Sequence, residues 1–163
     1  MYILTVINIS ILTVSIQIMA DTSLNENRIG LLVWQTSNVW QSNLRKLLRD
    51  YNISVNEYLI LETIFNLDKI NKNISQIAIS KNTSIVTSVV SSKLTFLEDK
   101  KFIKRLYSGN NRSNKITLTK NGYDLVENLI QNVERVEKQF FEKLNQETFN
   151  FTNSLKLLLG KKI

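Results

Sequence analysis

The stretch that decides the fold spans residues 97–122 and reads LEDKKFIKRLYSGNNRSNKITLTKNG. Residues 102–107 and 115–118 are rich in apolar and strand-forming side chains, and the polar segment 108–113 between them predicts a turn. The stretch therefore predicts a two-stranded β-hairpin. Because an isolated hairpin is unstable in water, we expect this one to lie against helices.

The hairpin and the residues just before it are strongly basic. From Lys93 to Lys120 there are eight lysines and arginines against two acids, so this segment carries a net charge of +6, out of +7 for the whole chain. Counterion release on binding to a polyanion requires cations clustered in this way. We therefore expect contact with nucleic acid through Lys104, Arg105, Asn110, Asn111, Arg112 and Lys115.

Other roles remain open for these cations. Residues that alternate along a strand point to opposite faces, so some of Lys104, Arg105 and Lys115 would face solvent or brace the hairpin instead. Arg112, at the expected tip, is either a DNA contact, which the spacing on both sides favours, or a solvated turn residue.

Three helices are predicted in the first half of the chain. Residues 27–51 carry apolar side chains at helical spacing, which indicates a long amphipathic helix. Ser54 and Glu57 form a capping-box pattern that would begin a second helix. Residues 73–76 offer a cap for a short third helix, and Ser75 within them would either cap that helix or donate to a phosphate.

A fourth helix is expected just before the hairpin, with Thr83 or Ser84 as its cap. Its predicted apolar face consists of Val86, Val89, Val90, Leu94 and Leu97. Its opposite face carries only small hydroxyl residues, which are Ser84, Thr87, Ser88, Ser91, Ser92 and Thr95. Hydroxyl groups contact phosphates or either base edge but discriminate poorly between bases, so this face is either a weakly specific DNA contact or a polar solvent face.

Two more helices are predicted after the hairpin. Thr119 would begin a long helix whose apolar stripe runs to Leu144, and a last helix would use Phe151, Leu155, Leu158 and Leu159. A tight helix-turn-helix followed by a basic hairpin is the arrangement of a winged helix, in which one helix enters the major groove and the hairpin, or wing, lies along the neighbouring backbone. The predicted fold is therefore mainly α with a small β-wing.

The wing segment resembles the MarR family of winged-helix regulators. The family pattern is Leu-Glu-x-x-Gly-Leu-(Ile/Val)-x-Arg, then Asp-x-Arg-x5-Leu-Thr-x-x-Gly; here the matching runs are Leu97–Arg105, Asn110-x-Arg112 and Leu118-Thr119-x-x-Gly122, without a gap. The resemblance covers about residues 27–160. It implies a homodimer built through residues 27–51 and 119–160, a DNA-binding core at residues 53–119, a palindromic double-stranded DNA site, and often release of the DNA by a small ligand.

Three departures from the family pattern affect how far the family's properties can be expected in this chain. Asn110 stands where the family usually has Asp, so a charged bracing of Arg112 is replaced by a weaker neutral hydrogen bond. Lys101 stands where a turn glycine is usual, which requires a less favourable backbone conformation or an altered turn. The recognition helix also fits two registers that differ by two residues, depending on whether they are counted from Ile77 or from Leu97.

Composition narrows the function classes further. The 163 residues suffice for one domain, and the chain contains no cysteine and no histidine, which excludes thiol chemistry, the usual zinc sites and His-based catalysis. No pair of carboxylates is spaced for acid/base work. We expect no enzyme activity, no cofactor and no metal, and a regulator, most readily a repressor, that works in the cytoplasm.

The N-terminus and the aromatic residues leave alternatives open. Residues 1–20 carry no charge, and from residue 21 the chain reads as an ordinary soluble sequence through to residue 163. We expect an over-extended start with the natural one at Met19; the alternatives are a dimer arm and a membrane anchor. The last gives the rival function, a membrane-associated or protein-interaction helical protein. The aromatic residues Trp34, Trp40, Phe140 and Phe141 are expected in the core or a dimer seam rather than in a ligand pocket.

Overall fold

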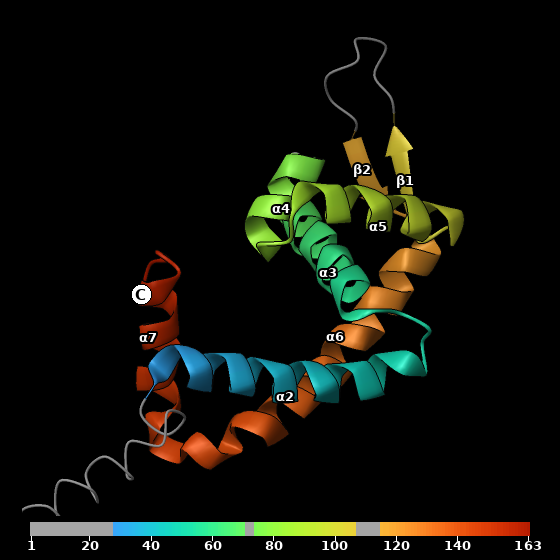
Figure 1. The fold of residues 1–163 in the computed structure, drawn as a ribbon. Coiled ribbons are helices and arrows are strands. Elements are labelled where there is room, and N and C mark those ends of the chain that lie inside the picture. Colours follow the sequence, from blue (N-terminus) through green and yellow to red (C-terminus); the bar gives the residue numbers. More distant parts are fainter. Residues whose placement is uncertain (1–27, 71–73, 107–114) are drawn as a thin grey trace, which may run out of the picture. The chain divides into compact units, whose positions relative to one another are not determined.

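The computed structural model describes residues 28–70, 74–106 and 115–163, and Figure 1 shows the arrangement of their elements. The order is α2 (Ile29–Arg49), α3 (Val55–Lys69), α4 (Gln76–Thr83), α5 (Thr87–Asp99), β1 (Ile103–Leu106), β2 (Lys115–Leu118), α6 (Lys120–Phe141), the 3-10 segment η1 (Glu142–Glu147) and α7 (Thr148–Leu158). The predicted fold class, mainly α with a two-stranded wing, is confirmed.

The chain divides into two compact units, residues 1–41 and residues 42–163. Within the first unit, residues 29–41 form the first part of α2, and the side chain of Gln41 donates to the hydroxyl of Ser37 one turn earlier at 3.1 Å. The second unit contains the rest of the helices and the hairpin, and it carries the candidate site.

Helix α3 forms the centre of the second unit. It packs against α4, α5, α6 and strand β2, and Figure 1 shows α4 and α5 near the end of α3 that faces the hairpin. The side chains of Ile60, Leu61 and Ile64 on α3 are fully buried. Around them lie the buried residues Ile79, Val90, Leu94, Leu97, Ile103, Ile116, Val126 and Leu129. Burial of this apolar surface is the main contribution that stabilises the arrangement.

The hairpin is tied to the helices through one of its faces. Strands β1 and β2 pair antiparallel, with Ile103 opposite Leu118 and Arg105 opposite Ile116. Ile103 and Ile116 are buried, and the backbone N–H of Ile116 donates to the carbonyl of Ile74, just before α4, at 3.2 Å. The hairpin therefore rests on the core as the sequence predicted.

A very close backbone approach joins the hairpin to α6. The Thr119 N–H donates to the carbonyl oxygen of Phe102 at 3.0 Å, while the Thr119 hydroxyl donates to the carbonyl of Lys101 at 2.7 Å and accepts from the Gly122 N–H at 3.0 Å. A Cβ atom added at Gly122 would overlap the Phe102 carbonyl oxygen and lie 2.8 Å from the carbonyl carbon. The Leu-Thr-x-x-Gly motif thus caps α6 and lets the helix start directly beside the hairpin.

The turn between α5 and β1 adopts the left-handed conformation that a glycine usually provides, although Lys101 occupies the position. Lys101 has φ 61°, its N–H donates to the backbone carbonyl of Glu98 at 2.8 Å, and the Phe102 N–H donates to the Leu97 carbonyl at 3.0 Å, which together form a Schellman cap. Of the two outcomes expected from the missing glycine, the less favourable backbone conformation is the one observed. A left-handed conformation at a side-chain-bearing residue costs about 1 kcal/mol.

The start of α5 corrects two sequence-based expectations. Helix α5 begins at Thr87 with Val86 as its N-cap, so the expectation that Thr83 or Ser84 caps it is wrong. Ser84 instead has φ 59° and ends α4, while the Thr83 hydroxyl closes the turn by accepting from the Ile85 N–H at 3.2 Å. Val86 is also not part of the buried apolar face, because it precedes the first helical residue and is 69% exposed.

The long C-terminal helix predicted from Thr119 onward is interrupted. Helix α6 ends at Phe141, and Asn145 in η1 has non-helical angles of φ 45° and ψ −119° before α7 begins at Thr148. Periodicity in the sequence did not reveal this break, because Leu144 follows Phe140 at the helical spacing of four residues.

The close approach at Gly122 generates a stability prediction. Replacing Gly122 by Ala should lower the free energy of unfolding by about 2–3 kcal/mol, because the added methyl group meets rigid backbone. Gly30→Ala, within α2, is the matched control, since nothing lies within 4 Å of its added Cβ. That variant should gain about 0.5–1 kcal/mol from helix propensity. Chemical denaturation measures both, and equal effects of the two substitutions would contradict the role of Gly122.

Candidate nucleic-acid interface

The outward face of α5 is composed of small hydroxyl residues, as the sequence predicted. Thr87, Ser88, Ser92 and Thr95 are exposed, and Ser91 is half-buried. Several of these hydroxyls already have a partner. Ser92 donates to the Val89 carbonyl at 2.9 Å, Thr95 donates to the Ser91 carbonyl at 3.3 Å, and the Thr87 hydroxyl lies 3.2 Å from that of Ser80. The face is therefore polar, uncharged and only partly available for new hydrogen bonds.

Helix α5 is fixed against α3 by a buried carboxylate. Glu57 is 3% exposed, and its two oxygens accept from the Ser54 N–H and from the Lys93 ammonium, both at 2.9 Å. The Ser54 hydroxyl accepts in return from the Glu57 N–H at 3.3 Å, so the predicted capping box is confirmed. Burial raises the pKa of Glu57, but the hydrogen bonds from Ser54 and Lys93 outweigh it and hold the pKa below its usual range. Glu57 is therefore ionised at neutral pH, and its charge orients α5 through Lys93.

A second acid joins the C-terminal end of α5 to the wing. The carboxylate of Glu98 accepts from the backbone N–H of Arg105 at 3.1 Å and from its Nε at 2.6 Å, and the guanidinium also donates to the Thr95 hydroxyl at 3.2 Å. The hydrogen bond from Arg105 lowers the pKa of the Glu98 carboxyl. Arg105 thus braces the hairpin, which is one of the roles left open for it, and its contact with DNA stays a prediction.

Lys104 and Lys115 lie on the other face of the hairpin. In the observed register Lys104 pairs with Thr117 and Leu106 with Lys115, so the two lysines share the face that points away from the core. Both are exposed, and neither forms an ion pair within the described part of the chain. Their ammonium groups are placed to meet an anion from solvent.

The remaining predicted DNA contacts fall into two groups. Ser75 is the N-cap of α4, where its hydroxyl accepts from the Ala78 N–H at 3.2 Å, and Ser84 lies in the turn before α5. For both, a phosphate contact stays a prediction. Asn110, Asn111 and Arg112 lie outside the described residues.

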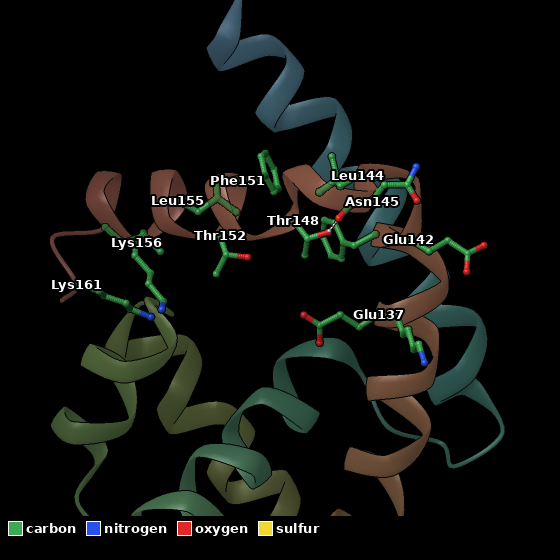
Figure 2. A pocket seen from close by; sticks show the side chains of 13 residues that line it. Glu137, Glu142, Leu144, Asn145, Thr148, Phe151, Thr152, Leu155, Lys156 and Lys161 are labelled. Atoms are coloured by element: carbon green, nitrogen blue, oxygen red, sulfur yellow. Dashed lines mark hydrogen bonds between the residues drawn. The ribbon is translucent and has the colours of Figure 1, made fainter. Parts of the chain in front are cut away.

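Sequence reasoning did not predict a hollow of about 540 Å³ between α6 and α7. Figure 2 shows Glu137 pointing from α6 into this space, with Phe151, Leu155 and Lys156 on the α7 side. Phe141 also lines it, and its ring centroid lies 6.3 Å from that of Phe151. The only sequence signal for this hollow was the aromatic residue Phe141, which we expected in the core or a dimer seam. The hollow itself could not be predicted, because it depends on the break in the helix at η1.

An acidic cluster lies between α3 and α6. The pKa of Glu62 is raised by burial and by the charges of Glu137 and Glu134, although a hydrogen bond from Tyr58 opposes the shift. Burial and the neighbouring Glu62 raise the pKa of the Tyr58 hydroxyl. No group of three potential metal ligands that could hold an ion occurs in the described ranges. Among the described residues, no helix has both the length and the hydropathy needed to cross a bilayer. Residues 1–20, for which a membrane anchor was one of the alternatives, lie outside the described residues.

The Glu98–Arg105 contact generates a prediction for the wing. Glu98→Gln should lower the free energy of unfolding by about 1 kcal/mol, because the side chains are 31% and 17% exposed and the pair is only partly shielded from water. Amide hydrogen exchange in β1 and β2 should become faster. Asp99→Asn removes the same charge from an exposed neighbour on α5 and should leave both quantities unchanged. Equal exchange rates in the two variants would show that Glu98 does not hold the hairpin.

Comparison with known proteins gives one curated relative and many solved structures of the same fold. No family model matches the chain. A protein of Bacillus subtilis (strain 168), described as the uncharacterized HTH-type transcriptional regulator YdcH, is 24% identical over 131 residues, which are 80% of this chain and 88% of that protein.

Three solved structures illustrate the likeness. The Staphylococcus aureus MepR–DNA complex matches with a TM-score of 0.72 at 23% identity, covering 83% of this chain and 97% of that one. A MarR-family transcriptional regulator from Rhodococcus sp. RHA1 gives 0.71 at 17% identity, covering 80% and 91%. CouR from Rhodococcus jostii RHA1, bound to p-coumaroyl-CoA, gives 0.74 at 17% identity, covering 87% and 98%.

Proposed function

We propose that this chain, which has the winged-helix fold of the MarR-family transcription regulators, binds double-stranded DNA in a sequence-specific manner and regulates transcription. The observation that carries the proposal is the exposed face of the wing, where Lys104 and Lys115 lie together in a segment of net charge +6. The likeness to a structure solved with DNA supports the same function.

The chemistry of the side chains indicates different roles for α5 and for the wing. The uncharged outer face of α5 would lie in the major groove, while the wing cations would neutralise phosphates on the neighbouring backbone. Phosphate contacts set the position on the duplex and supply most of the affinity, and contacts from α5 supply the sequence preference. Arg112 would contribute to the wing contacts.

We also propose a homodimer, formed through residues 27–51 and 119–160. The amphipathic pattern of the first segment supports it, and so do the large exposed apolar side chains near the C-terminus, which are Phe149, Leu157, Leu158, Leu159 and Ile163. A dimer would bind a palindromic site, and we propose repression, with release by a small ligand. CouR, solved with p-coumaroyl-CoA, supports the ligand by analogy of fold.

Binding to DNA is tested by gel shift and fluorescence anisotropy on genomic fragments that include the chain's own promoter. Binding should weaken steeply as salt is raised, because cations on the protein release counterions from DNA. Arg112→Ala should lower affinity for all duplexes and reduce the salt slope by about one. Lys162→Ala, which removes an exposed cation beyond the end of α7, should change neither quantity. The absence of salt-sensitive binding at low ionic strength would exclude the proposed function.

The dimer is tested separately by sedimentation velocity. The wild-type chain should sediment as a dimer at micromolar concentration, and Leu157→Glu together with Leu158→Glu should give a monomer, since charges on a buried seam are strongly unfavourable. Lys162→Glu, which places a carboxylate beyond the end of α7, should remain dimeric. A wild-type monomer over the whole concentration range would contradict the dimer.

A further inference from the structure

Val86 is an unfavourable choice for the position that it occupies. It is the N-cap of α5 and makes no side-chain hydrogen bond to the first helical turn. Ser, Thr, Asp and Asn stabilise an N-cap because their side chains accept from orphan N–H groups, and valine is among the poorest residues there. Val86 is also 69% exposed, so most of its surface lies outside the core. Folding accounts for neither feature.

The surroundings of Val86 lack the side chains that usually read bases. From Thr87 to Ser92 the sequence of α5 is TSVVSS, which contains no Arg, Lys, Asn, Gln, Asp or Glu. Bidentate recognition of guanine or adenine in the major groove requires Arg, Lys, Asn or Gln, and cytosine is read by a carboxylate. The side chains present offer only single hydroxyl hydrogen bonds and apolar contact.

One feature of the major groove fits an exposed apolar side chain. Thymine alone among the four DNA bases carries a methyl group at C5, which projects into the major groove and is recognised by apolar contact. In a helix-turn-helix, the residues at the N-terminus of the recognition helix are the ones that reach base edges. Val86 lies at this N-terminus, and the Thr87 hydroxyl beside it is engaged with that of Ser80.

We propose that Val86 is a specificity-determining residue that contacts a thymine C5-methyl group in each half of the DNA site. The proposal rests on the proposed function and deepens it, because it names the chemical group by which α5 selects its sequence. The wing cations supply affinity without regard to sequence, and Val86 supplies a preference for a T·A pair at one position. Burial of one methyl group accounts for about a fourfold preference per half-site.

The test begins with binding sequences selected from a random duplex library by the full-length chain. Each thymine of the selected site is then replaced by deoxyuridine, which removes only the methyl group, and affinity is measured by anisotropy at fixed salt. For the wild-type chain, one position per half-site should show a loss of about fourfold. At that position C·G should bind weakly, and 5-methylcytosine·G should recover part of the loss, since the methyl group returns.

Protein variants link this loss to the side chain. Val86→Ser should abolish the deoxyuridine effect, while Val86→Thr, which keeps one methyl group, should retain part of it. Both variants supply a capping hydroxyl, so their Tm should rise by about 2–4 °C. Arg112→Ala is the control, because it should weaken binding to every duplex and leave the deoxyuridine effect unchanged.

The outcomes separate the two proposals. Salt-sensitive binding with no deoxyuridine effect at any position, or with an effect that persists in Val86→Ser, overturns the role of Val86 and leaves DNA binding intact. A Tm of Val86→Ser below that of the wild type means that Val86 stabilises the fold, and it also overturns the proposal. If no duplex in the library is bound at low salt, the proposed function fails as well.

Discussion

The buried carboxylate of Glu57 is the constraint on which the winged-helix unit depends. A buried charge is tolerated only when it is paired and hydrogen-bonded, and Glu57 is satisfied by Ser54 at the start of α3 and by Lys93 in the middle of α5. The beginning of one helix and the rotation of the other are thereby fixed together. From α5 the second pair, Glu98 with Arg105, extends the same fixation to the wing. Helix α5 is therefore held by ion pairs to α3 and to the wing, while the apolar core supplies most of the stability.

Much of this arrangement could be predicted because it is encoded locally. The capping box at Ser54, the hairpin strands and the Thr119 cap each depend on residues within a few positions of one another, and all three are confirmed. The start of α5 was not predictable from periodicity, since Val86 has the spacing of a core residue but lies just outside the helix. The hollow beside α7 was missed for a different reason. It depends on the break at Asn145, and the segment Glu142–Glu147 contains no glycine or proline that would have predicted the end of a helix.

In the proposed interface, affinity for DNA and selectivity among DNA sequences come from different elements, because the wing carries the cations and the outer face of α5 is uncharged. In the proposed complex the cations of the wing would act on phosphates, which every duplex offers, and the outer face of α5 carries no charge from Thr87 to Ser92. Changes in ionic strength would therefore alter how tightly DNA is held with little effect on which sequences are preferred. The charge of the wing could be predicted from the sequence, but the ion pair between Arg105 and Glu98 could not. Strand alternation left both faces open until the register was known.

The contact of Gly122 with the Phe102 carbonyl couples the orientation of α6 to that of the hairpin. No flexible residue separates β2 from α6, because Thr119 follows the last strand residue directly and caps the helix. With 22 residues, α6 is about 33 Å long at 1.5 Å per residue. A tilt of about 5° around its start would move its far end by about 3 Å at that length. Conversely, a displacement imposed at the α7 end of the helix would rotate the hairpin slightly, because the start of α6 is in direct backbone contact with Phe102.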